Sequence, residues 1–361
     1  MTQLLQVRRD AITTAELAEI EERPLAEGEV RVRVGRWALT ANNISYALTG
    51  NTIGYWTFYP APGGEAWGIV PVWGFAEVSE SRHAEVPVGT RIWGFLPMAS
   101  DWVMQPVKVS ERGFTDGAPH RAAMAAVYNQ YQRTNDDPPA MQAFADQRSL
   151  LFPLLFTGWV IGDYLEDNGH FGAEQVIIGS ASSKTGFAAA HYVRELAGRA
   201  IRVIGLTSPG NKAFTEGLGL YDQVLTYEAA ESLDAAVPTA YVDMAGDAAL
   251  RSRLHHRFGE QMKASITVGA THWQATGPEG ELPGAKPQFF FAPGQIAKRQ
   301  SDWGPGVVDR KVLEANLAFL PKIATTLRIR SSAGGEAVAA AYDAMVHGRV
   351  PPDEGLILSF N

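Results

Sequence analysis

Hydrophobic and polar positions follow two different patterns along the chain. From Glu29 to Gly113 the pattern is that of half-buried strands. "EVRVRVGRWAL" alternates strictly, and "GIVPVWGFAEV" and "GTRIWGFLPM" are short, rich in β-formers and broken by Gly and Pro. This part predicts a small β-barrel or sandwich. Residues 114–150 are more polar, and we expect helix there, with a loop at "RTNDDPPA".

From about Leu151 short apolar runs alternate with helical ones. The expected helices cover Thr157–Leu165, the run ending near Leu196, Asn211–Leu218, Glu228–Ala236 and Ala248–Phe258. Between and after them come the strand-like runs "EQVIIG", "AIRVIGL", "YDQVLTY", "TAYVDMAG", "KASITVGA" and "PQFFFAP". This alternation is typical of βαβ units and a parallel sheet.

The two patterns together predict an α/β protein of two domains. A chain of 361 residues is too long for one ordinary core. The C-terminal part returns to a mixed pattern and ends in the strand-like run "GLILSF". We therefore expect a β domain at 1–150, completed by about 296–361, and a doubly wound parallel-sheet domain at 151–295.

Charge and composition narrow the classes of function. The chain has 31 basic and 39 acidic residues, a formal net charge of −8, which argues against non-specific binding to nucleic acid or to an anionic membrane. It has no cysteine, so it forms no disulfide, thiol nucleophile or zinc–thiolate site. The apolar stretch near Leu150–Ile161 contains Pro153 and is too short to cross a bilayer. Because the first residues carry Arg8, Arg9 and Asp10 and no long apolar run, we expect no secretory signal and a cytoplasmic location.

One stretch, "QVIIGSASSKTGFAAAHYVREL" at 175–196, passes from a strand-like run through a small polar turn into a helical run. Such a turn often holds a phosphate. Lys184 and Thr185 fit the end of a kinase-type phosphate loop, but Ile178 and Ser183 stand where that loop needs its two glycines. This argues against a kinase-type loop.

A dinucleotide-binding turn fits the same stretch better. In such a turn the pyrophosphate rests on the amides at the start of the helix, where the dipole is positive, and small residues let the helix pack closely. Small residues recur here every three positions, and serine hydroxyls can bond phosphate oxygens as well. A tight turn that holds no ligand stays the alternative. The candidate residues are Ser180, Ser182, Ser183, Lys184, Thr185 and Gly186.

The end of the next expected strand bears on which dinucleotide could bind. A chain that binds NAD usually has an acidic residue about 20 positions on, to hold the ribose 2′-hydroxyl. Here Thr207 and Ser208 end the strand, no acid is present, and Lys212 follows four residues after Ser208. A hydroxyl and a lysine would accept a 2′-phosphate, so this region favours NADP(H). A solvated helix lysine is the alternative for Lys212.

Over most of its length the chain resembles the medium-chain dehydrogenase/reductase superfamily, in its zinc-independent, quinone-oxidoreductase-like branch. Asn42, Ser45 and Tyr46 fall on the family's Asn-x-x-Asp-Tyr segment within "EGEVRVRVGRWALTANNISYALTG". Further similar segments are "EVPVGTRIWGF", "FTGWVIGDYLED", "VIIGSASSKTGFAAAHYV", "VIGLTSPGNKAFTEGLGLYDQVLTY" and "GGEAVAAAYDAMVHGRVPPDEGLILSF". The resemblance implies a GroES-like β-barrel domain and a Rossmann domain.

The resemblance also implies roles for single positions. Ser208, Lys212 and Tyr227 match the surroundings of the 2′-phosphate, and the later strand ends match the backbone that passes the ribose and nicotinamide. Where the zinc-binding branch has a Gly-His-Glu segment, this chain reads "GIVPVWGF", so no metal is expected. The family also implies a homodimer. The remaining implied cofactor residues are Thr157, Ala245, Gly246, Gly269, Ala270, Thr271, Phe290 and Phe291.

Two functions remain open at this stage. One is an NADPH-dependent oxidoreductase that transfers hydride to a quinone, enone or similar activated carbonyl compound, with Tyr46 as the candidate proton donor. The aromatic residues of "GYWTFYPAPGGEAWG" would then line a flat, hydrophobic substrate cleft, or else belong to the core or to dimer contacts. The other function is a non-catalytic NADP-binding sensor or scaffold protein of the same fold.

Overall fold

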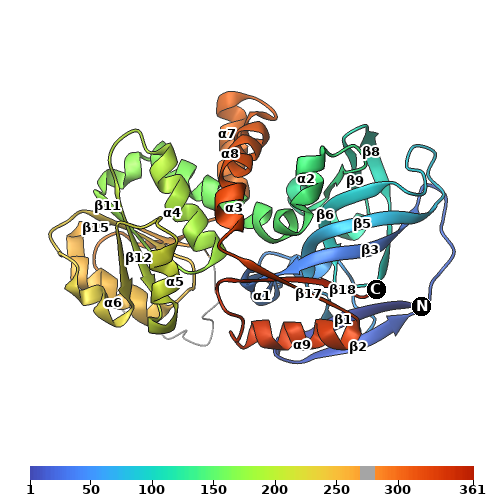
Figure 1. The fold of residues 1–361 in the computed structure, drawn as a ribbon, viewed down its shortest axis with the longest axis horizontal. Coiled ribbons are helices and arrows are strands. Elements are labelled where there is room, and N and C mark those ends of the chain that lie inside the picture. The colour runs from blue at the N-terminus through green and yellow to red at the C-terminus, as the bar shows by residue number, and fades with distance from the viewer. Residues whose placement is uncertain (269–280) are drawn as a thin grey trace. The chain divides into compact units, whose positions relative to one another are not determined.

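The computed structural model describes residues 1–268 and 281–361, and the chain divides into two compact units (Figure 1). Unit 1 comprises residues 1–150 and 328–361, and unit 2 comprises residues 151–327. Within the described residues, no helix is both long and apolar enough to cross a membrane.

Unit 1 is built mainly from antiparallel β structure, and β17 and β18 pair in parallel. A three-stranded sheet has the order β2-β1-β4, and a nine-stranded sheet has the order β17-β18-β3-β5-β6-β10-β9-β8, with β7 also paired to β3. The strands are β1 (Thr2–Arg8), β2 (Ala15–Ile20), β3 (Val30–Leu39), β4 (Trp67–Gly68), β5 (Pro71–Ser81), β6 (Arg91–Pro97), β7 (Asp101–Met104), β8 (Pro106–Ser110), β9 (Gly113–Asp116), β10 (Gln130–Arg133), β17 (Arg328–Ala333) and β18 (Glu354–Ser359).

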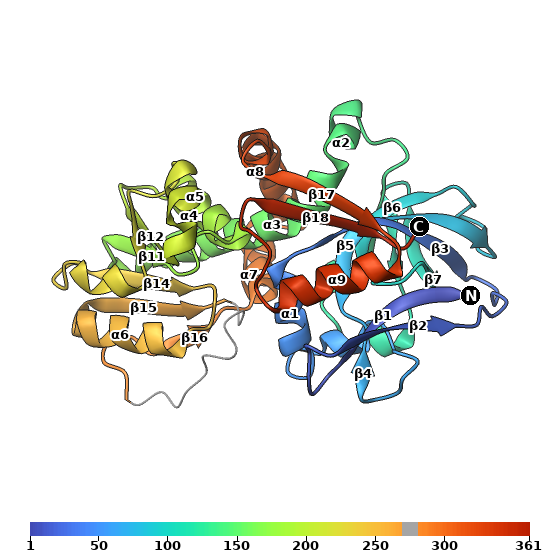
Figure 2. The same cartoon turned by 60° about the horizontal axis from the view of Figure 1, so that its bottom comes forward.

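Short helices complete unit 1. Near the C-terminus of the chain, α9 packs against β1, β2, β17 and β18 (Figure 2). Residues 42–46, which fall on the family's Asn-x-x-Asp-Tyr segment, lie within α1. The amide N–H of Thr40 donates to Asn43 Oδ1, which satisfies one backbone donor where this helix begins. The α-helices that lie in or begin in unit 1 are α1 (Ala41–Leu48), α2 (Pro139–Ala143), α3 (Ala145–Asp167, which continues into unit 2) and α9 (Gly335–Val346).

The expectation of helix throughout 114–150 was wrong. β9 and β10 lie in this region, and β10 pairs antiparallel with both β6 and β9. The pairing with β6 is made with a strand outside this region, so the local polar pattern could not reveal it.

Unit 2 contains a six-stranded parallel sheet of order β13-β12-β11-β14-β15-β16, as the alternating pattern predicted. Its strands are β11 (Gln175–Ile178), β12 (Arg202–Thr207), β13 (Gln223–Thr226), β14 (Thr239–Asp243), β15 (Met262–Thr267) and β16 (Pro287–Phe289). Its remaining α-helices are α4 (Lys184–Leu196), α5 (Lys212–Gly217), α6 (Ala248–Phe258), α7 (Ala292–Trp303) and α8 (Val307–Ala324). The expected helix at Glu228–Ala236 is only a short 3₁₀ segment, η6 (Glu228–Ser232).

Both faces of this sheet are buried. Ile177 and Tyr241 belong to a buried cluster with residues of α6 and η6. Side chains alternate along a strand, so the neighbouring Val176 and Ile178 face the other side, and they are also fully buried. Parallel strands covered on both sides read as continuous apolar runs, as "QVII" does.

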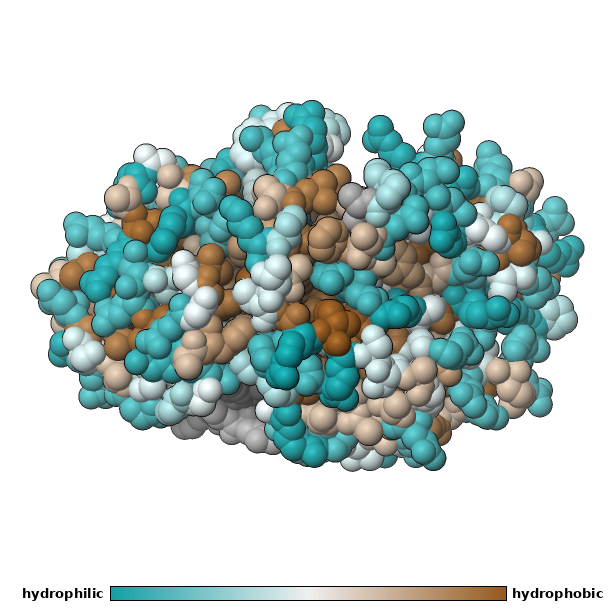
Figure 3. Space-filling view, viewed as in Figure 1, coloured by the Kyte–Doolittle hydropathy of each residue, from teal (hydrophilic) through white to brown (hydrophobic). Residues whose placement is uncertain are grey.

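The helices α7 and α8 belong to unit 2, so the segment that completes unit 1 begins at Arg328 rather than near 296. The reason is the packing of α8 on α4. The His191 ring stacks on Phe319 with centroids 3.7 Å apart, and the Tyr192 hydroxyl donates to Asn316 Oδ1 at 2.8 Å. On the face shown in Figure 3, hydrophilic residues predominate at the outer end of α7 and α8.

Close contact between helices also explains two glycines of α3. A Cβ on Gly158 would lie 2.5 Å from Ala188 Cβ of α4, and a Cβ on Gly162 would lie 2.8 Å from the backbone of Tyr192. These distances are too short for any side chain. Glycine therefore lets α3 and α4 approach each other beside the start of the polar turn.

Candidate functional site

The turn between β11 and α4 is held in an uncommon backbone conformation. Ser180 has φ +51°, in the left-handed region that non-glycine residues rarely adopt and that costs about 1–2 kcal/mol. The amide of Ser183 donates to Ser180 O at 2.8 Å, and the amide of Ala181 donates to Leu206 O at 2.9 Å. Backbone strain that the surroundings maintain in this way is typical of functional turns.

Two tyrosines lie against this turn. Burial raises the pKa of Tyr227 to about 12, although hydrogen bonds with Ser180 oppose the shift. Tyr241 is fully buried, and its hydroxyl has no hydrogen-bond partner within residues 1–268 and 281–361. A Cβ on Gly179 would lie 2.8 Å from that hydroxyl, so glycine is required at the first position of the turn.

Ser183 and Gly186 shape the start of α4. Ser183 is the N-cap, and its Oγ accepts from the amide of Gly186 at 3.0 Å. A Cβ on Gly186 would lie 2.7 Å from Ser180 O, which gives this position the close-packing role that the third glycine has in dinucleotide-binding turns. Thr185, in the first turn of the helix, has an amide N–H with no acceptor inside α4.

The hydroxyls of Ser182 and Ser183 have hydrogen-bond partners within the protein. Ser182 is buried, and its Oγ lies 3.2 Å from both Thr207 Oγ1 and Asn211 Nδ2. Ser183 Oγ serves as the helix cap. In this turn the serine side chains therefore hold the backbone in place, and the backbone amides at the start of α4 are the groups suited to an anion, with the positive charge of Lys184 beside them.

The end of β12 offers a hydroxyl and a cation beside the turn. Ser208 is half-buried and precedes a short 3₁₀ segment, and Lys212 follows as the first residue of α5. Lys212 Nζ lies 3.2 Å from Glu216 Oε1, and the two side chains are 41% and 52% exposed. An exposed pair of this kind contributes only about 0.3–0.5 kcal/mol, so Lys212 can exchange Glu216 for a stronger partner.

Hydrogen bonds connect the candidate residues of three strand ends. Ser182 contacts Thr207, the amide of Tyr227 donates to Thr207 O at 3.0 Å, and the Tyr227 side chain bonds Ser180. The ends of β11, β12 and β13 thus meet around Thr207. This is the carboxyl edge of the sheet, where open α/β sheets bind their ligands.

The next strand end is organised by Asp243, which the sequence pattern did not identify as a candidate. Its fully buried carboxylate accepts from the amides of Ala245 and Gly246 and from Arg251. Burial raises the pKa of Asp243, although these hydrogen bonds and the Arg251 charge act in the opposite direction. The candidates Gly269, Ala270 and Thr271 lie outside the described residues.

Three other candidates lie apart from the strand ends around Thr207. The Thr157 hydroxyl donates to Pro153 O within α3 at 2.9 Å. Phe290 is buried beside Tyr164, with ring centroids 5.4 Å apart, whereas Phe291 is 46% exposed.

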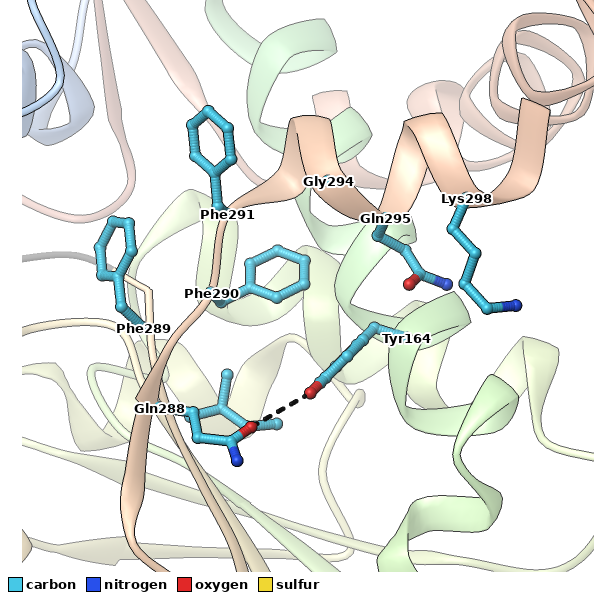
Figure 4. Close-up of a pocket in the computed structure, with 9 residues that line it drawn as sticks. Tyr164, Gln288, Phe289, Phe290, Phe291, Gly294, Gln295 and Lys298 are labelled. Carbon is cyan, nitrogen blue, oxygen red and sulfur yellow. Dashed lines mark hydrogen bonds between the residues drawn. The ribbon is translucent and has the colours of Figure 1, made fainter. Parts of the chain in front are cut away.

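Phe290 and Phe291 line a pocket of about 220 Å³ between the end of β16, α7 and α3 (Figure 4). Figure 4 shows the Phe290 ring pointing into this pocket and the Phe289 and Phe291 rings pointing away from Tyr164. The other residues that line this pocket are Tyr164, Ile266, Gln288, Phe289, Gly294, Gln295 and Lys298.

Tyr46 lies within an aromatic cluster of unit 1. It is 6% exposed, and its ring centroid is 4.5 Å from that of Tyr55. Its hydroxyl oxygen accepts from Asn42 Nδ2 at 2.7 Å and from Trp73 Nε1 at 3.3 Å. Burial raises the pKa of Tyr46 well above its usual range, so the hydroxyl keeps its proton at neutral pH.

The other aromatic residues of this region divide between two roles. Trp56, Phe58 and Tyr59 are 0–2% exposed and belong to the core. Tyr55 is 6% exposed, and its hydroxyl lies 2.8 Å from that of Tyr128. Among the residues that the structure describes, no three His, Asp or Glu side chains are grouped as metal ligands.

Comparisons with known proteins bear on the fold and the family. No curated protein has a significant match to the sequence. CurA from Vibrio vulnificus, solved in complex with NADPH, has a similar structure, with a TM-score of 0.65 and 12% identity over 99% of both chains. Quinone oxidoreductase from Pseudomonas syringae pv. Tomato DC3000 has a TM-score of 0.57 and 15% identity over 99% of this chain and 100% of that one.

A third similar structure is the yhdH oxidoreductase from Salmonella enterica in complex with NADP, with a TM-score of 0.53 and 15% identity over all of both chains. These similarities confirm the expected fold class, a GroES-like β domain with a Rossmann domain. Residues 37–351 match the model of the family described as "Protein of unknown function (DUF2855)", and the chain belongs to that family.

Proposed function

We propose that the protein is an NADPH-dependent oxidoreductase that reduces a quinone, enone or similar activated carbonyl compound without zinc. One observation carries the proposal. The strained turn after β11 adjoins the end of β12, where Ser208 and Lys212 are present and no acidic residue lies between Thr207 and Lys212. The cofactors named with the CurA and yhdH structures support it.

The described residues fit a dinucleotide phosphate. The first turn of α4 presents backbone amides at the positive end of the helix dipole, and Lys184 adds a charge at the same place. Gly179 and Gly186 leave the space that a Cβ would fill. Ser208 and Lys212 would hold the 2′-phosphate, with the ring of Tyr227 nearby. When bound, NADPH supplies the hydride.

The chain's own groups then have to complete the reduction. Reducing an activated double bond also requires a proton. Tyr46 would donate it from its hydroxyl, whose oxygen already accepts two hydrogen bonds. The absence of cysteine removes the thiolate ligand used by the zinc-binding branch.

The first test is cofactor preference, measured by titrating NADPH and NADH into the wild type and three variants. A hydrogen bond to a charged group contributes about 1.5–3 kcal/mol, and each 1.4 kcal/mol is a tenfold change in affinity. Lys212→Ala should therefore weaken NADPH by about 10- to 100-fold and leave NADH nearly unchanged. Ser208→Ala should do less. Glu216→Gln, which removes the competing carboxylate, should slightly strengthen NADPH.

Lys322→Ala is the control, because it removes an exposed lysine from α8 and should change neither affinity. Equal weakening of both cofactors by Lys212→Ala, or equal affinity of the wild type for NADPH and NADH, would contradict the assigned phosphate site. Tight NADPH binding without oxidation of NADPH by any member of a panel of quinones and enones would favour the alternative, a non-catalytic NADP-binding sensor or scaffold.

A further inference from the structure

Asp243 ends β14 with a fully buried carboxylate that joins two elements. Oδ1 accepts from the amide of Gly246 at 2.8 Å and from that of Ala245 at 3.1 Å. Oδ2 accepts from Arg251 Nη1 of α6 at 2.6 Å, and the two side chains are 0% and 11% exposed. One carboxylate thus fixes both the turn after β14 and the helix that follows it.

The main chain at the same place ties three strand ends together. The carbonyl of Asp243 accepts from the amide of Val268, which follows β15. The carbonyl of Val242 accepts from the amide of Gly179, the first residue of the turn after β11. The position of Asp243 therefore sets the geometry of the carboxyl edge around the proposed cofactor site.

The turn that Asp243 holds includes a backbone conformation that favours glycine. Gly246 has φ +74°, in the left-handed region. Asp247 then caps α6, with Oδ1 accepting from the amide of Leu250 at 3.0 Å. Successive acidic residues thus bind the amides on each side of the turn, so that the peptide groups of Ala245 and Gly246 have a fixed orientation.

Stability alone is a weak explanation for a buried ion pair here. Moving a carboxylate and a guanidinium out of water costs several kcal/mol per ion, and apolar replacements of such pairs are often as stable or more stable. Directional bonds to two particular amides suit a role in positioning the backbone. Supporting groups of this kind hold a binding site in its productive geometry.

We propose that Asp243, held by Arg251, is a positioning residue for the part of the cofactor that NADPH and NADH share. It fixes the backbone of Ala245 and Gly246 at the carboxyl edge of the sheet. This inference rests on the proposed dinucleotide-binding function and goes beyond it. It predicts that changing Asp243 or Arg251 lowers the affinity for NADPH and for NADH by the same factor.

The test compares Asp243→Asn with Asp222→Asn. Asp222 makes similar bonds at the opposite end of the sheet, where its Oδ2 accepts from the amide of Val203 at 2.7 Å and from Arg194 Nη2 at 2.9 Å. For each variant we would measure the affinities for NADPH and NADH, the free energy of unfolding in urea, and hydrogen–deuterium exchange of peptides covering residues 243–247. Arg251→Lys, which keeps the positive charge, is the milder second variant.

Asp243→Asn should weaken both cofactors by about tenfold, the factor that corresponds to one lost hydrogen bond, and should speed exchange at Ala245 and Gly246. Arg251→Lys should weaken both by about threefold, since its charge remains but its geometry changes. Asp222→Asn should lower stability without changing either affinity.

Wild-type affinities in both Asp243→Asn and Arg251→Lys would overturn the inference and leave Asp243 a purely structural residue. If Asp243→Asn does not fold, Arg251→Lys decides between these outcomes. A wild type that binds neither cofactor would instead refute the proposed function, and this inference with it.

Discussion

At the scale of single residues, the Tyr46 hydroxyl has a defined direction for its proton. Its oxygen accepts from Asn42 and from Trp73, which uses both of its acceptor positions. The O–H is then left to donate, and burial keeps it protonated at neutral pH. A tyrosine in a merely structural role would use its proton on a neighbour, as Tyr342 does toward Ile12 O at 3.0 Å.

Removing this hydroxyl tests the proposed proton donor. General acid catalysis typically contributes 10²–10⁴-fold, so Tyr46→Phe should lower kcat by roughly 100-fold on any substrate found in the quinone and enone panel. NADPH affinity should stay unchanged, because the cofactor residues lie in unit 2. Tyr342→Phe removes an equally buried hydroxyl and should affect only stability. A kcat for Tyr46→Phe within twofold of the wild type would assign the proton to another group.

Residue-level contacts were the hardest to predict from the sequence. The serines at 180–183 were recognised as a turn, but their partners Thr207 and Asn211 lie 25 and more positions away. Whether a hydroxyl points outward to a phosphate or inward to a neighbouring strand depends on those long-range neighbours. Asp243 was readable only as the polar end of the run "TAYVD", and that pattern does not show which amides it binds.

At the scale of elements, strong local patterns predicted the helices well. α6 covers Ala248–Phe258 as expected, and α4 ends at the expected Leu196. α3 begins at Ala145, whereas the expected helix began at Thr157. Pro153 lies inside α3, and because proline usually ends a helix, the sequence did not predict the part before it. The expected helix after β13 is short because Asp234 bonds the amide of Ala236 and so competes with helical hydrogen bonds.

The packing of α4 on α8 gives unit 2 a sensitivity to acid. Burial lowers the pKa of His191 to about 4, against about 6.5 in an unfolded chain. Between these two pH values the unfolded state binds more protons than the folded state, so stability falls as the pH decreases through this range. The slope from this group is about 1.4 kcal/mol per pH unit at most.

His191→Phe should remove this part of the pH dependence and retain the stacking on Phe319. Urea unfolding of unit 2 at pH 7, 6, 5 and 4.5 measures how the free energy of unfolding changes with pH. The exposed His256 of α6 provides the matched control, because His256→Phe should leave the slope as in the wild type. Identical slopes for the wild type and His191→Phe would show that His191 is not the responsible group.

At the scale of the whole molecule, the sequence predicted the two-part organisation and the fold class. The change from period-two patterning to alternating strands and helices falls close to the observed boundary at Leu151. The return to unit 1 was placed too early, because α7 and α8 pack on helices that lie over 100 positions earlier. α7 bonds α3 through Arg299 and Asp163, and α8 packs on α4. Such a contact leaves no trace in local periodicity.

The open edge of the parallel sheet leads to the final prediction, on assembly. In the described part of the chain, β16 is the last strand of its sheet. Phe289, its final residue, is 58% exposed, and Phe291, two residues later, is 46% exposed. An edge strand with exposed aromatic residues is a template for pairing with another strand. We propose that a second copy covers it, because a two-fold axis through such an edge brings the same strand and the same aromatic residues together from both copies.

The prediction is a homodimer of twice the chain mass in light scattering after size exclusion. Phe289→Asp combined with Phe291→Asp should shift the protein to a monomer, since each charge would face its own copy across the two-fold axis. The control is Leu313→Asp combined with Leu317→Asp on α8, where the leucines are comparably exposed at 44% and 41%. That variant should remain dimeric. A monomeric wild type would refute the dimer. If only the α8 variant were monomeric, the interface would lie at α8 and not at β16.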